Sequence, residues 1–158
     1  MITQTQDRFR LLFDHSSEAH FIMVGDSITD CNDAAVKLLK ATCKDQVLSY
    51  HPRKFSPLYQ PDGMLSSEKS AHMDALARKN GFHRFEWLHQ RMDGEVFPVQ
   101  VTLNAIGIDG KPALIAVWHD LTELKQKEDR LRLANEKMKS DLAAASAIQR
   151  SLLCEFYQ

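Results

Sequence analysis

The stretch RMDGEVFPVQVTLNAIGIDGKPALIAVWHDLTE, from Arg91 to Glu123, decides the fold of this chain. Two Asp-Gly pairs, Asp93-Gly94 and Asp109-Gly110, separate three runs rich in apolar residues. An Asp-Gly pair between alternating segments predicts a hairpin, because a two-residue primed turn requires positive φ at both central positions. The middle run alternates apolar and polar residues, so the sheet is expected to have a core on one face only. Strands are therefore predicted over residues 82–91, 95–106 and 112–119.

The segment upstream of these strands predicts a second hairpin and several helices. Its two short strands flank the turn residues Gly25-Asp26-Ser27. Asn32 is suited to cap the helix that follows, because its side chain can accept a hydrogen bond from an unpaired backbone N–H. Three prolines between residues 50 and 63 forbid a long helix there and leave short helical turns and loop. The predicted strands are 20–24 and 28–31, and the predicted helices are 4–15 with Phe9, Leu12 and Phe13 as its packing side, 33–39 and 67–80.

The last segment, residues 121–153, contains no glycine or proline and repeats apolar residues at intervals of seven. Such a repeat favours a left-handed coiled coil. Two registers stay open, because the second seam position falls either on Leu142 and its heptad equivalents or on the series that includes Ile148. The alternative is a single amphipathic helix packed on the domain. A parallel homodimer is expected through Leu124, Leu131, Met138, Leu142, Ala145 and Leu152.

Length, charge and cysteine content exclude several classes of protein. A chain of 158 residues is expected to form one core, and a net charge of −1 provides no basic field for nucleic acid. Three widely spaced cysteines form neither a disulfide framework nor a metal signature. No apolar run approaches the ~20 residues that span a bilayer, and the N-terminus is too polar for a signal peptide. We therefore expect a cytoplasmic protein without a nucleic-acid or membrane partner.

The sequence also lacks the motifs of catalysis. It contains no glycine-rich phosphate loop, no His-Glu-x-x-His and no phosphoacceptor histidine motif. His83 and His89 share a strand face, but six residues at ~3.3 Å each place them too far apart for one metal ion. The chain is therefore expected not to be an enzyme and to have neither catalytic nor metal-binding residues.

Three motifs in order carry a resemblance to a known family: CNDAA at residues 31–35, FEW through RMDG at residues 85–94, and VWHDLTE at residues 117–123. Their order and spacing resemble a PAS domain, or sensory box, with its C-terminal signalling helix. The resemblance covers about residues 7–153. It implies an α+β fold with a five-stranded antiparallel sheet in the order 2-1-5-4-3, helices over one face and a ligand cavity between them. The implied parts are an N-terminal helix (1–18), a PAS core (19–120), a signalling helix (121–153) and a tail (154–158).

The end of the chain, DLAAASAIQRSLL at residues 141–153, resembles the lead-in to bacterial metal-dependent Ser/Thr phosphatases of the sporulation and stress-response type. In that family a proline commonly follows the paired leucines, whereas this chain has Cys154. The phosphatase domain is absent, and we expect the chain to be a truncated part of a longer protein. The resemblance implies a sensory and dimerisation module that relays a ligand or interaction signal through the coiled coil to this effector.

Strand parity identifies candidate pocket residues. If alternate residues of the strand 95–106 face the core, then Phe85, Trp87 and His89 face it across the turn. The predicted cavity lies between these strands and the helix 67–80, with His89 as its polar anchor and Trp87, Val99 and Trp118 as its walls. No ligand or cofactor is identified, although a small molecule is a possible partner.

Resemblance to other PAS proteins leaves alternatives open. His89 and Trp118 fall near positions that hold the flavin of light-oxygen-voltage domains, but the photoreactive Asn-Cys-Arg motif is missing. Oxygen-sensing haem PAS domains take their axial histidine from the helix that here carries His72, and Arg78 also resembles that group. A haem or other cofactor sensor is therefore one alternative, and a pure protein-interaction module with a filled core is another.

Overall fold

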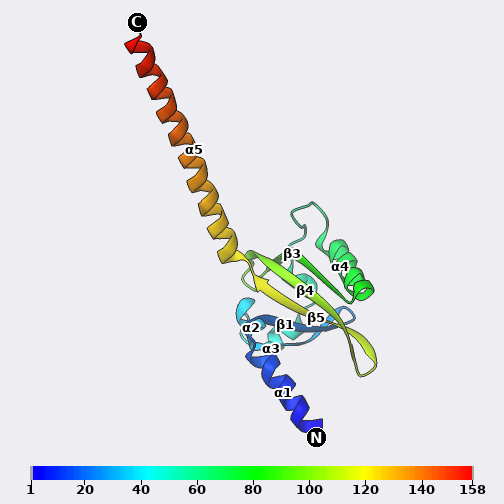
Figure 1. Cartoon of the computed structure of the whole chain (residues 1–158). Coiled ribbons are helices and arrows are strands. Elements are labelled where there is room, and N and C mark those ends of the chain that lie inside the picture. The colour runs from blue at the N-terminus through cyan, green and yellow to red at the C-terminus, as the bar shows by residue number, and fades with distance from the viewer. Residues whose placement is uncertain (1, 158) are drawn as a thin grey trace. The chain divides into compact units, whose positions relative to one another are not determined.

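The computed structural model describes residues 2–157, with side chains from residue 4, and the chain divides into two units at Leu121 and Thr122. The second unit is the helix α5 (Thr122–Phe156) (Figure 1). The first unit contains, in chain order, α1 (Ile2–His15), β1 (Ala19–Val24), β2 (Ser27–Cys31), α2 (Asp33–Leu38), α3 (Lys44–Ser49), the 3₁₀ helix η1 (Pro52–Phe55), α4 (Ser66–Asn80), β3 (Phe82–Gln90), β4 (Val96–Ile108) and β5 (Lys111–Asp120).

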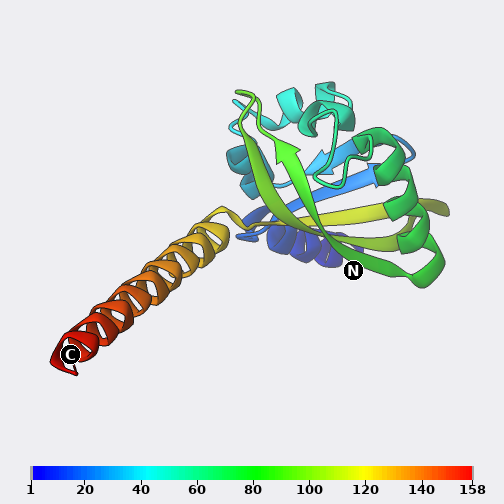
Figure 2. The same cartoon turned by 90° about the horizontal axis from the view of Figure 1, so that it is seen from above.

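The five strands form one antiparallel sheet in the order β2-β1-β5-β4-β3, which confirms the predicted fold. β5 lies between β1 and β4, so that Trp118 is paired with Ala19 on one side and Val101 on the other. The α4 helix packs against β3 and β4, whereas α2 packs against β1 and α3 against β2 (Figure 2). The core is therefore formed between the sheet and these helices, as the alternation in β4 predicts.

One of the two Asp-Gly turns differs from the prediction. Asp109-Gly110 has φ of 51° and 74° and joins β4 to β5 as a primed two-residue turn. At Asp93-Gly94 only the glycine has positive φ, and five residues separate Gln90 from Val96. The N–H of Gly94 donates to the carbonyl of Arg91 at 3.0 Å, which closes a longer turn. The expected primed turn is therefore wrong here, although the strand parity is unchanged.

Two helices also differ from the sequence expectation. Phe13 of α1 is buried, but Phe9 and Leu12, predicted to pack beside it, are 53% and 76% exposed. The six-residue helix α3 was not predicted, and its start at Cys43 has no side-chain capping bond that could have signalled it. Short helices of this kind depend on tertiary packing, here of the buried Val47.

Asn32 connects three elements of the first unit and is fully buried. Its Oδ1 accepts from the N–H of Ala35, the predicted helix cap, and also from the N–H of His20 in β1, both at 3.0 Å. Its Nδ2 donates to the carbonyls of Phe13 and Glu18, both at 2.9 Å. One amide side chain thus forms hydrogen bonds with backbone groups at the C-terminal end of α1, the N-terminal end of α2 and the start of β1.

We expect Asn32→Ala to lower the free energy of unfolding by about 3 kcal/mol, because it leaves several buried backbone groups without partners. Chemical denaturation measures this loss. Asn104→Ala is the matched control, since Asn104 lies partly exposed on β4, and it should cost about 0.5 kcal/mol or less. Equal losses for the two variants would contradict the connecting role of Asn32.

The α5 helix is 35 residues long, extends three residues beyond the predicted end and contains no buried residue. At ~1.5 Å per residue it measures about 50 Å. Among residues 2–157, no helix is both long and apolar enough to cross a membrane. Its exposed large apolar residues include members of the heptad stripe, namely Leu124, Leu131, Met138, Leu142 and Leu152.

Candidate ligand pocket

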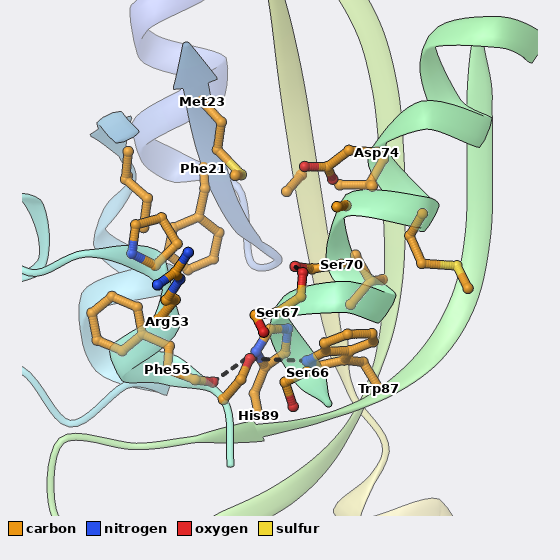
Figure 3. Close-up of a pocket in the computed structure, with 18 of the residues that line it drawn as sticks. Phe21, Met23, Arg53, Phe55, Ser66, Ser67, Ser70, Asp74, Trp87 and His89 are labelled. Carbon is orange, nitrogen blue, oxygen red and sulfur yellow. Dashed lines mark hydrogen bonds between the residues drawn. The ribbon is translucent and has the colours of Figure 1, made fainter. Parts of the chain in front are cut away.

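A cavity of about 720 Å³ opens into the first unit between the inner face of the sheet, η1 and α4 (Figure 3). This volume lies in the range of small-molecule sites, which are mostly apolar with a few placed polar groups. The sheet supplies aromatic walls from three strands, because alternate residues of each strand face the same side. These walls are Phe21 of β1, Phe85 and Trp87 of β3, and Trp118 of β5, and η1 adds Phe55.

His89 lies at the base of this cavity and is 8% exposed. Its Nδ1 is 2.8 Å from the carbonyl oxygen of Phe55. A carbonyl oxygen can only accept, so Nδ1 must carry the proton. Burial lowers the pKa of His89 from 6.5 to about 3, against the smaller opposing effect of the Phe55 hydrogen bond. The ring is therefore neutral at physiological pH, and Nε2 holds a lone pair.

The second ring nitrogen of His89, Nε2, is buried and has no hydrogen-bond partner within the described part of the chain. A buried acceptor without a partner is unfavourable by about 1–3 kcal/mol. Native proteins retain few such groups, and those that persist often mark a functional site or an unseen ligand or water. Nε2 is therefore a buried acceptor of the cavity that lacks a hydrogen-bond donor, which a ligand or a water molecule could supply.

Aromatic stacking ties His89 to the central strand. The His89 and Trp118 rings are stacked with centroids 3.5 Å apart and an interplanar angle of 17°. Trp118 also packs against Phe21, at 4.2 Å between centroids. Trp87 is fixed separately by donating its indole N–H to Oγ of Ser56 at 3.0 Å. His89 is thus in direct contact with a side chain of β5.

Two buried polar residues that the sequence analysis missed hold the loop over the cavity. Gln60 accepts from the N–H of Leu88 at 2.9 Å and donates to the Leu88 carbonyl at 3.1 Å, which mimics a strand partner for β3. Gln60 also donates to Oγ of Ser66, and that hydroxyl donates to the carbonyl of Pro57. A glutamine in a proline-rich loop gives no sequence signal for such a role.

The α4 helix contributes the polar side of the cavity. Figure 3 shows Ser70 and Asp74 on α4 across the cavity from Phe21 and Met23 of β1. Burial raises the pKa of Asp74, more than Arg78 lowers it. The exposed Arg53 also lines the cavity, so its polar groups include both signs of charge.

The structure brings together three of the four predicted wall and anchor residues: Trp87, His89 and Trp118 all line the cavity. Val99 does not line it. Val99 is fully buried in the core, and Val101 and Leu103, further along β4 where α4 packs, form that wall instead.

His72 does not line the cavity either and is exposed. The α4 residues that line it include Ser67, Ser70, Ala71 and Asp74, which share one helical face. His72 lies off that face, so it is not positioned as the axial ligand that the haem alternative requires.

Solved structures with a similar fold come from several organisms. The PAS domain of a protein from Colwellia psychrerythraea is 14% identical with a TM-score of 0.64, covering 75% of this chain and 98% of its own. The PAS domain of an HTR-like protein from Haloarcula marismortui is 22% identical with a TM-score of 0.57, at coverages of 75% and 93%. A third, from a LuxR-family transcriptional regulator of Burkholderia thailandensis in complex with ethanol, is 17% identical with a TM-score of 0.59, at 72% and 96%.

Sequence comparison gives the family. A comparison with curated proteins found no significant match. The family model of the PAS domain, in contrast, matches residues 17–123, from just before β1 to the first turn of α5. Together with the strand order of the sheet, this match establishes that the chain belongs to the PAS domain family.

Proposed function

We propose that this chain is the sensory and dimerisation part of a cytoplasmic signalling protein, in which a small molecule bound in the cavity controls a C-terminal effector. The observation that carries the proposal is the cavity itself, with its aromatic walls and the unpartnered Nε2 of His89. A module that acted only through protein contacts with a filled core would need no such space. The free thiols Cys31, Cys43 and Cys154 suit a reducing compartment.

The proposed route of the signal runs along β5. Ala116 and Trp118 line the cavity, and the strand ends at Asp120, only two residues before α5 begins. A ligand that binds two geometries of β5 with different affinity shifts their populations. Because the chain is continuous from β5 into α5, such a shift alters the start of the helix.

The end of β5 is held by an arginine from the β3–β4 turn. Arg91 donates to Oδ2 of Asp120 at 3.2 Å and also to the carbonyl of Leu38 at the end of α2. Its guanidinium lies over the ring of Phe97, 3.8 Å from the centroid. Arg91 thus ties the last residue of β5 to the rest of the core, which suits a junction through which strand movement is passed on.

The proposed effector is a metal-dependent Ser/Thr phosphatase domain, and two copies of α5 would join it to the PAS cores as a parallel coiled coil. The support is the resemblance of residues 141–153 to the segment that precedes such phosphatases, together with the exposed heptad stripe of α5. Fusing the chain to the catalytic domain of such a phosphatase and comparing its activity with and without ligand tests this pairing. An activity that never responds to any ligand of the cavity would contradict it.

Native mass spectrometry of the purified chain tests ligand binding directly. We expect a non-covalent adduct that is lost on denaturation and that disappears when the cavity is filled by Ala71→Trp. Ala71 lines the cavity from α4, so a tryptophan at this position is expected to occupy part of the cavity volume. A mass equal to the bare polypeptide under all expression conditions, with no thermal stabilisation by any compound of a small-molecule library, would contradict the proposal.

We expect Asp120→Ala to lower the free energy of unfolding by about 1–2 kcal/mol and to weaken the effect of ligand on dimerisation. The reason is that Arg91, whose side chain is 10% exposed, loses a charged partner. Chemical denaturation and sedimentation with and without ligand measure the two effects. Glu18→Ala is the control, because its pair with His119 is exposed and should contribute about 0.5 kcal/mol or less. Identical behaviour of the two variants would argue against the Arg91 junction.

A further inference from the structure

Resting on the proposed ligand binding, we infer the chemical class of the ligand: a compact, mostly apolar molecule, such as a phenol or an indole, whose O–H or N–H donates a hydrogen bond to Nε2 of His89. This goes beyond the existence of a ligand, because it states which groups the ligand must present and which it must not. Three features of the cavity carry the inference, and each restricts the ligand independently.

The first feature is the fixed tautomer of His89. The carbonyl of Phe55 occupies Nδ1 and forces the proton onto it, so Nε2 offers only a lone pair. A carboxylate, ketone or ether would bring a second lone pair to this atom and would be repelled. Making Nε2 a donor would require a charged imidazolium in a buried site, which is disfavoured by desolvation. The site therefore selects a donor.

The second feature is that three serines of the cavity already have hydrogen-bond partners. Oγ of Ser56 accepts from Trp87, Oγ of Ser66 donates to the carbonyl of Pro57, and Oγ of Ser70 donates to the carbonyl of Ser67. Within the described residues, the other buried side-chain atom without a hydrogen bond is Nε of Arg91, which does not line this cavity. Among the described residues, Nε2 is accordingly the buried side-chain atom of the cavity that still lacks a hydrogen bond and that a ligand donor would satisfy.

The third feature is the aromatic surroundings, which favour a flat ring. Phe85 and Trp87 pack edge to face, and Trp118 stacks on His89 and packs at a tilt against Phe21. Planar rings can stack or pack edge to face against such walls. Because Nε2 is buried, the ligand donor reaches it when the side chains around His89 move apart while Nδ1 keeps its bond to Phe55. Trp118 of β5 is stacked on His89, so this movement links the donor group to β5.

The probes that test this inference are phenol and anisole, which share a ring and differ in that only phenol has a donor. In titrations of the full chain followed by NMR or calorimetry, we expect phenol to bind about tenfold more tightly than anisole, the value of roughly one buried hydrogen bond. In protein labelled with ¹⁵N-histidine, phenol and not anisole should shift the Nε2 resonance of His89. In His89→Phe, which keeps a ring but has no acceptor, the preference should disappear.

Equal affinity for the two probes, saturable binding of neither, or an Nε2 resonance that phenol leaves unchanged would each overturn the inference. The wild-type comparison and the resonance decide the matter even if His89→Phe fails to fold. A native ligand without any O–H or N–H group would refute this ligand class and leave the sensory function intact. A further outcome is that phenol is preferred and yet bound phenol changes neither dimerisation nor a fused effector. That result would support the proposed class of ligand and refute the proposed relay from β5 to α5.

Discussion

Leu131→Asp is expected to convert the proposed dimer into a monomer at tens of micromolar protein. Leu131 belongs to the heptad stripe of α5 and is 71% exposed in the single chain. In a parallel coiled coil it would be buried against its counterpart, so the substitution removes two buried leucines and introduces two carboxylates into the seam. Losing the leucines alone costs about 3–6 kcal/mol, which weakens dimerisation by a factor of roughly 10²–10⁴.

The same helix provides a matched control. Leu133 is 59% exposed and lies two residues further along, outside the seam in both possible registers. Leu133→Asp should therefore leave the dimer intact, whereas Leu131→Asp should abolish it, as measured by light scattering or sedimentation. Thermal unfolding of the PAS core should be similar in both variants. A wild-type chain that is already monomeric at tens of micromolar would contradict the coiled coil.

Local patterns predicted most element boundaries, whereas the strand order was an implication of the resemblance to PAS domains. Alternation in the β4 run fixed which residues face the core, and this parity remained correct although the Asp93-Gly94 turn has a different form. The parity survives because the inward set Phe85, Trp87 and His89 pairs with the inward set of β4. The cap at Asn32 was also predictable, since it depends on residues only three positions apart.

The parts that sequence could not provide are long-range side-chain contacts. The bond between His89 and the Phe55 carbonyl joins residues 34 positions apart, and no local rule pairs them. Strand parity predicts which face of β4 a residue lies on, but not which part of the strand α4 covers. Val99 was therefore expected to line the cavity, whereas Val101, on the same face, lines it. His72 shows a different limit, because the resemblance to haem PAS domains indicates a helix that can carry a ligand but not which of its residues line the cavity.

Acidification is expected to destabilise the protein through His89, and the direction follows from its pKa. Burial lowers the folded-state pKa to about 3, while the unfolded chain has the ordinary value of 6.5. Above pH 6.5 both states are neutral at this residue, so His89 contributes no pH dependence. Between pH 6.5 and 3 the unfolded state binds a proton that the folded state does not, so the free energy of unfolding falls by about 1.4 kcal/mol per pH unit.

Denaturation of the wild type and of His89→Phe at pH 7, 6, 5 and 4.5 isolates this effect. Carboxylates with lowered pKa, such as Asp30 and Asp93, also lose stabilising charge as the pH falls, but they are common to both proteins and cancel in the comparison. From pH 6.5 to 4.5 the wild type should lose about 2 kcal/mol more than the variant, because the unfolded histidine is already half protonated at pH 6.5. His89→Gln serves as a second variant if phenylalanine does not fit. Parallel pH profiles would mean that His89 takes up its proton in the folded protein, and the neutral acceptor on which the ligand class depends would then be lost.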